Sequence, residues 1–595
     1  MKIYGKMLAA LGVLLPVIAL SGCAQEVTES LTSLISADET WEKEDASVSY
    51  ALEDKASLYE DENNEVITVY LTVGLGNSAD GTNYTWEEVN AHSLSYYEEL
   101  GIDPYMCEAV LQVGDENGPV SGEFGYGETA ANATVRLRGE GASEREQKSY
   151  RIEIMSGKGS WDDQKVIILN KQSSDEIRIT NKLAYTLMQD IPGMISVRTQ
   201  LVHLYVKDKT EGENGLFVDY GLYTKVEQIN KTYLKNHGFD SSGQLYKAES
   251  FDWARHEDSI QMITAEGYDL EKFEQYLEVK GDEDHTGLIE ALEAVNNYNI
   301  DFGTVLDTYF DRDNLYSWLA FHMLTGNKSV AEGSYYLYSP QTEDTWYFIS
   351  WNNEDAFYEI YERIKDENYD PSWNTGIFSF TGCVLFERIF SDPDCREEFA
   401  AVMEEMYSEY LTEERIESLA QELAENAKPY IYSLPDSFYQ KVNSTVYDQI
   451  VNSLADEVAK NYQYFLTSLN QPWPFHILEP ETDETTLTLK WEESQVIQDP
   501  DSDTAQTVTY TVELSDSWSF TNCIVSETGM EGTSLTVELP TAGQYFVRVR
   551  AVTSLGYTQD AYEYYYTQKD TTVYSTQCFY IREDGSVELS LYVEE

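Results

Sequence analysis

Alternating apolar and polar residues predict a pair of strands in the first third of the chain. Residues 133–137 are apolar at every second position, and a second alternating run covers residues 150–154. A period of two places side chains alternately on the two faces of a strand. Gly139 and Gly141 lie between the runs, where glycine leaves the backbone free to turn. We therefore predict a strand, a glycine turn and a second strand over this segment.

Apolar residues at helical spacing replace this alternation in the middle of the chain. Residues 315–324 carry apolar side chains three and four positions apart, which predicts a helix. Asp313 stands before it as the expected N-cap, and Gly326 lies just past its end. His322 falls on the apolar face. Because buried polar groups normally find partners, we expect a hydrogen-bonded core histidine there and not a base. A second helical region is predicted over residues 395–469.

Short alternating strands return after the helix-breaking Pro472 and Pro474. Turns rich in Gly, Asp and Ser separate them, and this repeated pattern is typical of an all-β sandwich. A further hairpin is predicted around Asp584 and Gly585, a sequence that favours a tight turn. The four predicted strands are Thr485–Trp491, Val508–Leu514, Ser534–Leu539 and Tyr545–Val552.

The run from Ala542 to Ala551, with Trp491 upstream, resembles a fibronectin type III module. The resemblance makes Tyr545 the corner tyrosine, a packing residue, and implies a spacer or binding surface without chemistry of its own. Four further tyrosines cluster within residues 562–566. They are interpreted either as half-buried packing residues of a strand or as rings that stack on sugars or proteins.

The beginning of the chain has the features of a lipoprotein signal peptide. Lys2 and Lys6 are followed by a short apolar run that ends in Leu-Ser-Gly-Cys23. This ending resembles the bacterial lipobox and implies cleavage before Cys23 and lipidation of that residue. Residues 24–47 are rich in Ser, Thr, Glu and Asp, which predicts a solvated tether. We expect a protein anchored by lipid on the extracytoplasmic face of the cell membrane; secretion with an incidental cysteine is the alternative.

Composition narrows the classes of partner. The chain has 595 residues, of which 42% are hydrophobic, so it has material for several cores. Its formal net charge of -67 disfavours nucleic acid and anionic headgroups, so the only predicted membrane contact is the lipid anchor. The acidity favours basic partners or divalent cations. Five widely spaced cysteines besides Cys23 form no zinc pattern, although Cys383 and Cys395 are either buried thiols or a disulfide.

Two segments carry candidate phosphate chemistry. In the first, Arg138 and Lys148 flank the glycine turn, where backbone N–H groups and cations suit an anion. The second begins as a strand over residues 346–349 and ends in oxygen donors of the kind that hold Mg²⁺. Each segment alone is also explained as an ordinary hairpin or loop. Their combination predicts two halves of a nucleotide-phosphate site.

The combination resembles the spore-coat CotH family of atypical kinases over roughly residues 66–469. Four motifs of that family appear in order. They are Arg138 to Ser143 with Lys148-Ser149-Tyr150; Arg178 with Asn181 to Ala184, and then Gly221 to Glu227; Leu245 to Lys247; and Val384 to Arg388 with Asp392-Pro393 and Arg396 to Phe399.

The chain departs from the family pattern at its catalytic and metal-binding motifs. Ser329 stands where the family has an aspartate in G-N-x-D, and Ser334 replaces an asparagine before the Y-L-Y strand. The metal motif W-D-x-D is replaced by a stretch with one anionic group and an adjacent aspartate. Loss of these charges removes the main terms of phosphoryl transfer, and Glu332 is the candidate replacement base. The metal ligands that the resemblance implies are Asn352, Glu354 and Asp355.

The resemblance implies an α+β fold, with an atypical protein-kinase-like domain over residues 48–470 that is β-rich first and helical later. The all-β region at residues 471–595 follows it. ATP and Mg²⁺ or Mn²⁺ are the implied cofactors, with Arg138 and Lys148 on the phosphates and Glu227 near the nucleotide base or the hinge. The implied reaction phosphorylates Ser or Thr of an extracytoplasmic protein substrate or envelope component. The alternatives are an inactive pseudokinase scaffold for an envelope protein or glycan, and a glycan-binding adhesin.

Overall fold

The computed structural model describes residues 52–592, apart from 61, 213–214, 332, 366–369, 497–504 and 568–571. The predicted signal peptide (1–23), its Cys23, the tether (24–47) and the candidate base Glu332 therefore lie outside the described residues. Within the described part of the chain, no helix has both the length and the apolar composition needed to cross a membrane.

The first region is an eight-stranded sheet in the order β1-β7-β8-β6-β5-β4-β2-β3. Strand β1 pairs in parallel with β7 and also antiparallel with β2, so the sheet closes on itself. Inward-facing Val, Leu and Ile side chains fill its interior. The strands are β1 (Val66–Gly74), β2 (Cys107–Asp115), β3 (Gly118–Pro119), β4 (Ala133–Arg138), β5 (Ser149–Ile154), β6 (Val166–Asn170), β7 (Thr199–Asp208) and β8 (Phe217–Glu227).

The predicted strand pair is present as β4 and β5, in a register that places Arg138 opposite Ser149. The simple glycine turn between them is wrong, because a short helix α3 (Glu140–Glu144) fills the connection. Gly139 has φ +75°, a conformation that glycine adopts without strain. The Ser143 hydroxyl donates to the Glu140 carbonyl at 2.6 Å and so closes the helical turn.

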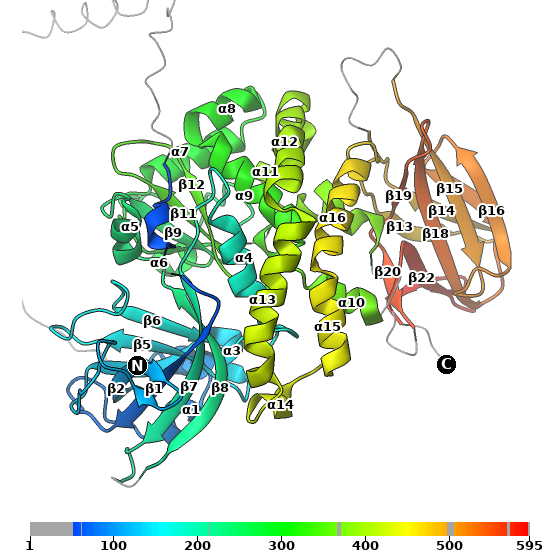
Figure 1. Cartoon of the computed structure of the whole chain (residues 1–595). Helices are drawn as coiled ribbons and strands as arrows, with labels where there is room; N and C mark the ends of the chain where they lie inside the picture. The colour runs from blue at the N-terminus through cyan, green and yellow to red at the C-terminus, as the bar shows by residue number, and fades with distance from the viewer. Residues whose placement is uncertain are drawn as a thin grey trace, which may run out of the picture. The chain divides into compact units, whose positions relative to one another are not determined.

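The second region combines a four-stranded sheet, in the order β10-β9-β11-β12, with helices around the largest core. Figure 1 shows α13, α15 and α16 side by side, in agreement with their contacts. The strands are β9 (Gln244–Ala248), β10 (Leu277–Val279), β11 (Tyr335–Ser339) and β12 (Tyr347–Ser350). The helices, with α1 and α2 of the first region, are α1 (Trp86–Ala91), α2 (Leu94–Leu100), α4 (Thr180–Met188), α5 (Lys231–His237), α6 (Leu270–Phe273), α7 (Thr286–Val295), α8 (Phe302–Tyr309), α9 (Arg312–Leu324), α10 (Glu359–Lys365), α11 (Val384–Ser391), α12 (Pro393–Glu405), α13 (Glu413–Ile431), α14 (Asp436–Tyr439), α15 (Ser444–Asn452) and α16 (Leu454–Ser468).

The predicted helix over residues 315–324 is α9, but its N-cap is Asp311 and not Asp313. The Asp311 carboxylate accepts the backbone N–H of Asn314 at 2.9 Å, so the helix begins earlier than its apolar pattern shows. Asp313 lies in the first turn, where a negative charge suits the helix dipole. All five cysteines in the described part of the chain are free, and Cys383 and Cys395 are buried thiols.

The last region is all-β. It contains a three-stranded sheet, β13-β14-β17, and a larger sheet in the order β16-β15-β18-β22-β23 with β19 paired to β18. The four predicted strands correspond to β14, β15, β17 and β18, and the Asp584-Gly585 hairpin joins β22 to β23. Tyr545 is buried and donates to the Thr541 carbonyl at 2.7 Å. The strands are β13 (Ile477–Thr482), β14 (Thr486–Trp491), β15 (Val508–Ser515), β16 (Cys523–Met530), β17 (Ser534–Glu538), β18 (Gly543–Thr553), β19 (Thr558–Asp560), β20 (Tyr564–Tyr566), β21 (Thr572–Tyr574), β22 (Thr576–Ile581) and β23 (Val587–Ser590).

Candidate functional site

The candidate site begins where β12 ends. Trp351 is buried, and the next residue, Asn352, adopts a left-handed conformation with φ +58°. Asparagine tolerates this region better than most residues because its short polar side chain can bond locally. The turn leads into a single 3₁₀ turn over Asn353–Asp355 that presents Glu354 and Asp355 in sequence. A sharp backbone turn therefore places both carboxyl groups immediately after a buried strand.

Arg138, at the end of β4, reaches this turn from the first sheet. Its guanidinium lies 5.3 Å from the centre of the Trp351 ring and donates to the Asn170 side chain. Burial lowers the pKa of Arg138, and the nearby Glu354 carboxylate opposes that shift. Two segments separated by some two hundred residues of sequence thus meet here, as the paired motifs predict.

Glu354 and Asp355 are half-buried and have hydroxyl groups as their closest partners. The Ser174 hydroxyl donates to Glu354 Oε2 at 2.9 Å. Burial raises the pKa of Glu354, against the effects of the Ser174 hydrogen bond and Arg138. Burial likewise raises the pKa of Asp355, and the nearby Ser329 hydroxyl opposes that shift. Arg145 in the β4–β5 connection attracts both carboxylates.

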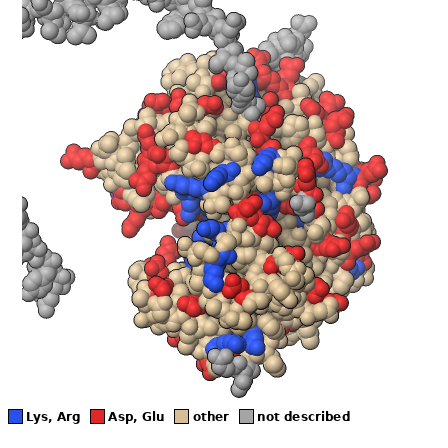
Figure 2. All heavy atoms as spheres, turned by 60° about the vertical axis from the view of Figure 1, so that its left-hand side comes forward, with Lys and Arg blue, Asp and Glu red and all other residues tan. Residues whose placement is uncertain are grey.

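The site therefore joins two arginines to two carboxylates whose charge is poorly compensated. Groups of this kind, with perturbed pKa values and specific charge partners, are typical of functional sites. Figure 2 shows several Lys and Arg side chains near a hollow on one face of the molecule, with Asp and Glu side chains scattered over the same face.

Neutral polar side chains occupy the position of the family's catalytic motif. The Ser329 hydroxyl donates to Asn327 Oδ1 at 2.8 Å, and Asn327 in turn contacts His322 and Asn353, each at 3.3 Å. His322 is fully buried and bonds Ser350 at 3.0 Å. Burial lowers the pKa of His322 to about 3, so it is neutral at physiological pH. The prediction of a hydrogen-bonded core histidine is confirmed.

Lys148 is half-buried, and its contacts differ from those of Arg138. Its amino group donates to the Ser143 carbonyl at 2.6 Å, within the β4–β5 connection. Burial lowers the pKa of Lys148, with an opposing effect of Glu146. Among the described residues, no contact joins its amino group to Glu354 or Asp355. A role on the phosphates therefore remains a prediction for Lys148.

Glu227 lies at the end of β8 in a buried ion-pair network. Arg198 donates to both carboxylate oxygens, at 3.0 and 2.6 Å, and His237 bonds one of them at 3.2 Å. Burial would raise the pKa of Glu227, but the hydrogen bonds from His237 and Arg198 hold it at about 2. This network explains the burial of Glu227 without a nucleotide, and its predicted place near the nucleotide base stays a prediction.

Sequence reasoning missed a buried ion-pair cluster that we call the Asp436 latch: Asp436, Lys171 and Arg178. Asp436, in α14, is fully buried and bonds Lys171 at 2.7 Å and Arg178 at 2.8 Å. It also accepts the backbone N–H of Leu222 in β8 at 2.6 Å and the Gln147 amide at 2.7 Å. The latch therefore ties the helical region to the first sheet and to the turn that carries Arg145.

The side chains near Glu354 provide too few ligands to hold a metal ion by protein groups alone. The described residues contain no group of three or more His, Cys, Asp or Glu side chains placed to hold one. The buried Asn353 Nδ2, which has no partner within the described chain, is a hydrogen-bond donor that a cation cannot use. Mg²⁺, however, commonly takes one or two carboxylates and completes its shell with phosphate and water. Glu354 and Asp355 fit a cation shared with a bound phosphate.

Comparison with known proteins gives one family match. The model of the family described as CotH kinase protein matches residues 135–465, more than half of the chain, from β4 to α16. Similar solved structures include that of a Helicobacter pylori proinflammatory kinase, CtkA, at 9% identity and a TM-score of 0.26; the similarity covers 53% of this chain and 93% of that one. None of the curated proteins is similar to the chain.

Proposed function

The chain belongs to the CotH kinase family, and from this premise we propose that it is an extracytoplasmic pseudokinase. In this proposal the site around Arg138 binds the phosphates of ATP, and phosphoryl transfer has been lost. The protein then acts as a binding scaffold for a surface or secreted protein. A fold by itself does not determine activity, so the proposal rests on the site.

The observation that carries the proposal is the contact of Ser329. A serine stands at the position of the family's aspartate, and its hydroxyl is engaged by Asn327 and Asp355. A serine hydroxyl is a poor proton acceptor at neutral pH, and general-base catalysis typically contributes 10²–10⁴-fold. The basic residues Arg138 and Arg145 persist beside Glu354. Binding of an anion is therefore supported better than its transfer.

One observation favours an active kinase as the second candidate. The Ser329 side chain lies close enough to Asp355 to lower its pKa, so the Asp355 carboxylate lies beside the position of the missing acid. Burial already raises the pKa of Asp355, as suits a proton acceptor that works nearer to neutral pH. In this version Asp355 takes the proton of a substrate Ser or Thr hydroxyl. ATP supplies the phosphoryl group, and a divalent cation held at Glu354 would neutralise charge on it.

Transfer of radiolabel from γ-labelled ATP, with Mg²⁺ or Mn²⁺ and a serine-rich protein substrate, separates the two candidates. The pseudokinase predicts ATP binding without transfer by the wild type, and a gain of transfer in Ser329→Asp because the acid is restored. The active-kinase version predicts transfer by the wild type that falls at least about 10²-fold in Asp355→Asn. Asp394→Asn, on the exposed first turn of α12, is the matched control. Absence of ATP binding in the wild type contradicts both.

We also propose that Cys23 carries the lipid that holds the protein on the extracytoplasmic face of the membrane. The order of charged, apolar and small residues before Cys23 supports this anchor. Cells fed a labelled fatty acid should label the wild-type protein, while Cys23→Ser should lose the label and leave the membrane fraction. Membrane retention of the unlabelled variant would exclude a lipid anchor.

A further inference from the structure

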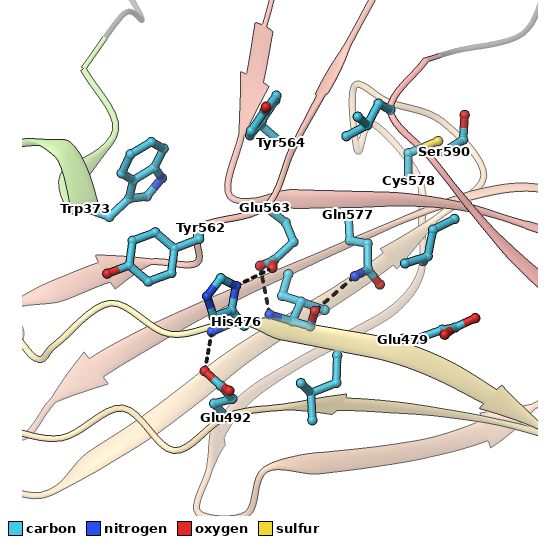
Figure 3. A pocket seen from close by; sticks show the side chains of 14 residues that line it. Trp373, His476, Glu479, Glu492, Tyr562, Glu563, Tyr564, Gln577, Cys578 and Ser590 are labelled. Atoms are coloured by element: carbon cyan, nitrogen blue, oxygen red, sulfur yellow. Dashed lines mark hydrogen bonds and ion pairs between the residues drawn. The ribbon is translucent and has the colours of Figure 1, made fainter. Parts of the chain in front are cut away.

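A second candidate binding site lies far along the chain from the kinase-like motifs. It is a pocket of about 940 Å³ bounded by Trp373 on one side and by the all-β region on the other (Figure 3). The walls come from the 3₁₀ turn Ser372–Asn374, from β13, β20, β22 and β23, and from residues next to β13, β14, β20 and β23.

Contacts fix the Trp373 wall in place. The neighbouring Ser372 donates to Gln559 Oε1 at 2.6 Å and accepts the backbone N–H of Asp560 at 2.9 Å. The Trp373 ring packs against Tyr562, with the ring centres 5.6 Å apart. Gln559 is fully buried in this junction. The pocket is therefore formed in advance, which lowers the entropy cost of binding.

Carboxylates dominate the charge of the pocket. Glu563 accepts hydrogen bonds from His476 Nδ1 at 3.0 Å and from the Ile477 backbone at 2.8 Å, and Figure 3 shows both bonds on the pocket wall. Glu492 accepts the His476 backbone N–H at 3.2 Å. Glu479 is exposed, and no lining residue is Lys or Arg. The wall thus presents three carboxylates without a compensating lysine or arginine.

Apolar and unpaired polar groups complete the wall. Leu478, Leu589 and Leu591 are large apolar side chains left 41–51% exposed. Gln577 is 7% exposed, and its Nε2 donates to the Ile477 carbonyl at 3.0 Å, whereas its Oε1 has no partner among the described residues. The buried indole N–H of Trp373 likewise has no partner there. A buried polar group without a partner is costly, and a ligand that supplies one removes that cost.

We propose that this pocket binds a basic peptide segment of a protein partner through a Lys or Arg side chain. The cation meets the carboxylates and the faces of Tyr562 and Tyr564, which attract positive charge. Its aliphatic stem covers the leucines. Its N–H groups suit the unpaired acceptor of Gln577, and a peptide carbonyl suits the donor of Trp373. A neutral sugar would also stack on the aromatic rings, but it would leave the carboxylates uncompensated.

The inference does not depend on the nucleotide site, because none of the residues that carry it belongs to the CotH motifs around Arg138 and Glu354. A partner can bind here whether or not the site around Arg138 transfers phosphate. In a protein of net charge -67, a basic partner also gains from long-range attraction during encounter.

Isothermal titration of the full-length chain tests the proposal with three probes. They are an acetylated peptide that alternates leucine with lysine and arginine, the same peptide with glutamine at each basic position, and an N-acetylglucosamine tetramer. We expect the basic peptide to bind and the glutamine peptide to bind at least about tenfold more weakly. The basic interaction should weaken in high salt, since the pocket is partly open to solvent.

Two double variants test whether the peptide binds in this pocket. Glu479→Gln with Glu492→Gln keeps shape and removes two charges, and should weaken the basic peptide by about tenfold. The matched control is Glu527→Gln with Glu538→Gln, which removes two exposed carboxylates of the same all-β region and should leave binding unchanged. Equal binding of the glutamine peptide, binding of the sugar alone, or an equal effect of both double variants would overturn the proposal.

Discussion

The Asp436 latch and the Glu354–Asp355 turn are two acidic sites that differ in how far nearby groups compensate the burial of their carboxylates. In the latch, two cations and two further donors surround one fully buried carboxylate. Burial would raise the pKa of Asp436, but Lys171 and Arg178 outweigh this effect and lower it. At the turn, burial prevails and raises the pKa of both carboxyl groups.

The difference suits two roles: Asp436 stabilises the fold, whereas Glu354 and Asp355 can interact with a ligand. A buried ion pair with all its partners stabilises one arrangement of the chain, and removal of one member leaves an unpaired charge. Half-buried carboxylates with hydroxyl partners remain available to an incoming cation or proton. The contrast explains how the chain can preserve a kinase-like scaffold while its catalytic motif changes.

The largest expected effect is that of Asp436→Asn. The substitution leaves Lys171 and Arg178 buried without a counter-charge, so we expect a loss of about 3–5 kcal/mol in the free energy of unfolding. Denaturant unfolding at pH 7 measures it, with Asp448→Asn as control, since Asp448 forms an exposed pair with Lys428 and should cost less than about 1 kcal/mol.

The same variant carries a pH test. A carboxylate with a lowered folded pKa contributes stability above its unfolded pKa and loses it as pH falls through the folded value. The difference in unfolding free energy between wild type and Asp436→Asn should therefore shrink below about pH 4. A difference that stays constant down to pH 2 would show that Asp436 is not the titrating member of the latch.

Gly221→Ala tests the latch from the side of β8, where an added side chain would meet Asp436. Gly221 has φ +77°, and an added Cβ would lie 2.1 Å from Asp436 Oδ2. Either the backbone or the latch must move, so we expect a loss of about 2–3 kcal/mol, measured by denaturant unfolding. Gly238→Ala is the matched control, because it has a similar φ of +86° but no atom within 4 Å of the added Cβ. Equal losses in the two variants would mean that backbone strain alone is responsible.

The smallest effect is expected at Glu354. A carboxyl group whose folded pKa is raised costs stability as pH rises above its unfolded value, because the folded state disfavours the charge. Glu354→Gln should therefore raise the melting temperature by about 1 °C at pH 7 and by less at pH 4. Scanning calorimetry at the two pH values measures this. A lower melting temperature at pH 7 would place Glu354 with the structural charges instead.

Periodicity predicted those parts of the fold that follow from local pattern. The alternation of β4, β5 and the four C-terminal strands, and the helical spacing of α9, are visible in neighbouring residues. Strand β16 was missed because only its Cys523, Val525 and Met530 are partly buried, and the short helix α3 because glycine suggested a turn. The latch could not be predicted from local pattern, because Arg178 and Asp436 are 258 positions apart in the sequence.

The site was predicted in outline for a similar reason. The order of the motifs predicted that Arg138 lies near Glu354 and Asp355, and the structure shows an electrostatic interaction between Arg138 and Glu354. Arg145 lies between the two parts of the first motif, so its attraction to both carboxylates became visible only in the structure. Glu227, in contrast, was predicted from its motif, but in the structure it is paired with Arg198 and His237.

The central claim is that the basic residues around Arg138 still bind a triphosphate, and ATP titration of Arg138→Ala tests it most directly. With Mg²⁺ present we expect the wild type to bind and this variant to bind at least about tenfold more weakly, as for a lost charge-assisted contact. Lys148→Ala should lower the affinity for ATP by a smaller factor. Lys158→Ala, which removes a half-exposed pair with Glu128, should bind as the wild type does. Equal affinity of wild type and Arg138→Ala, or no binding by either, would contradict the account.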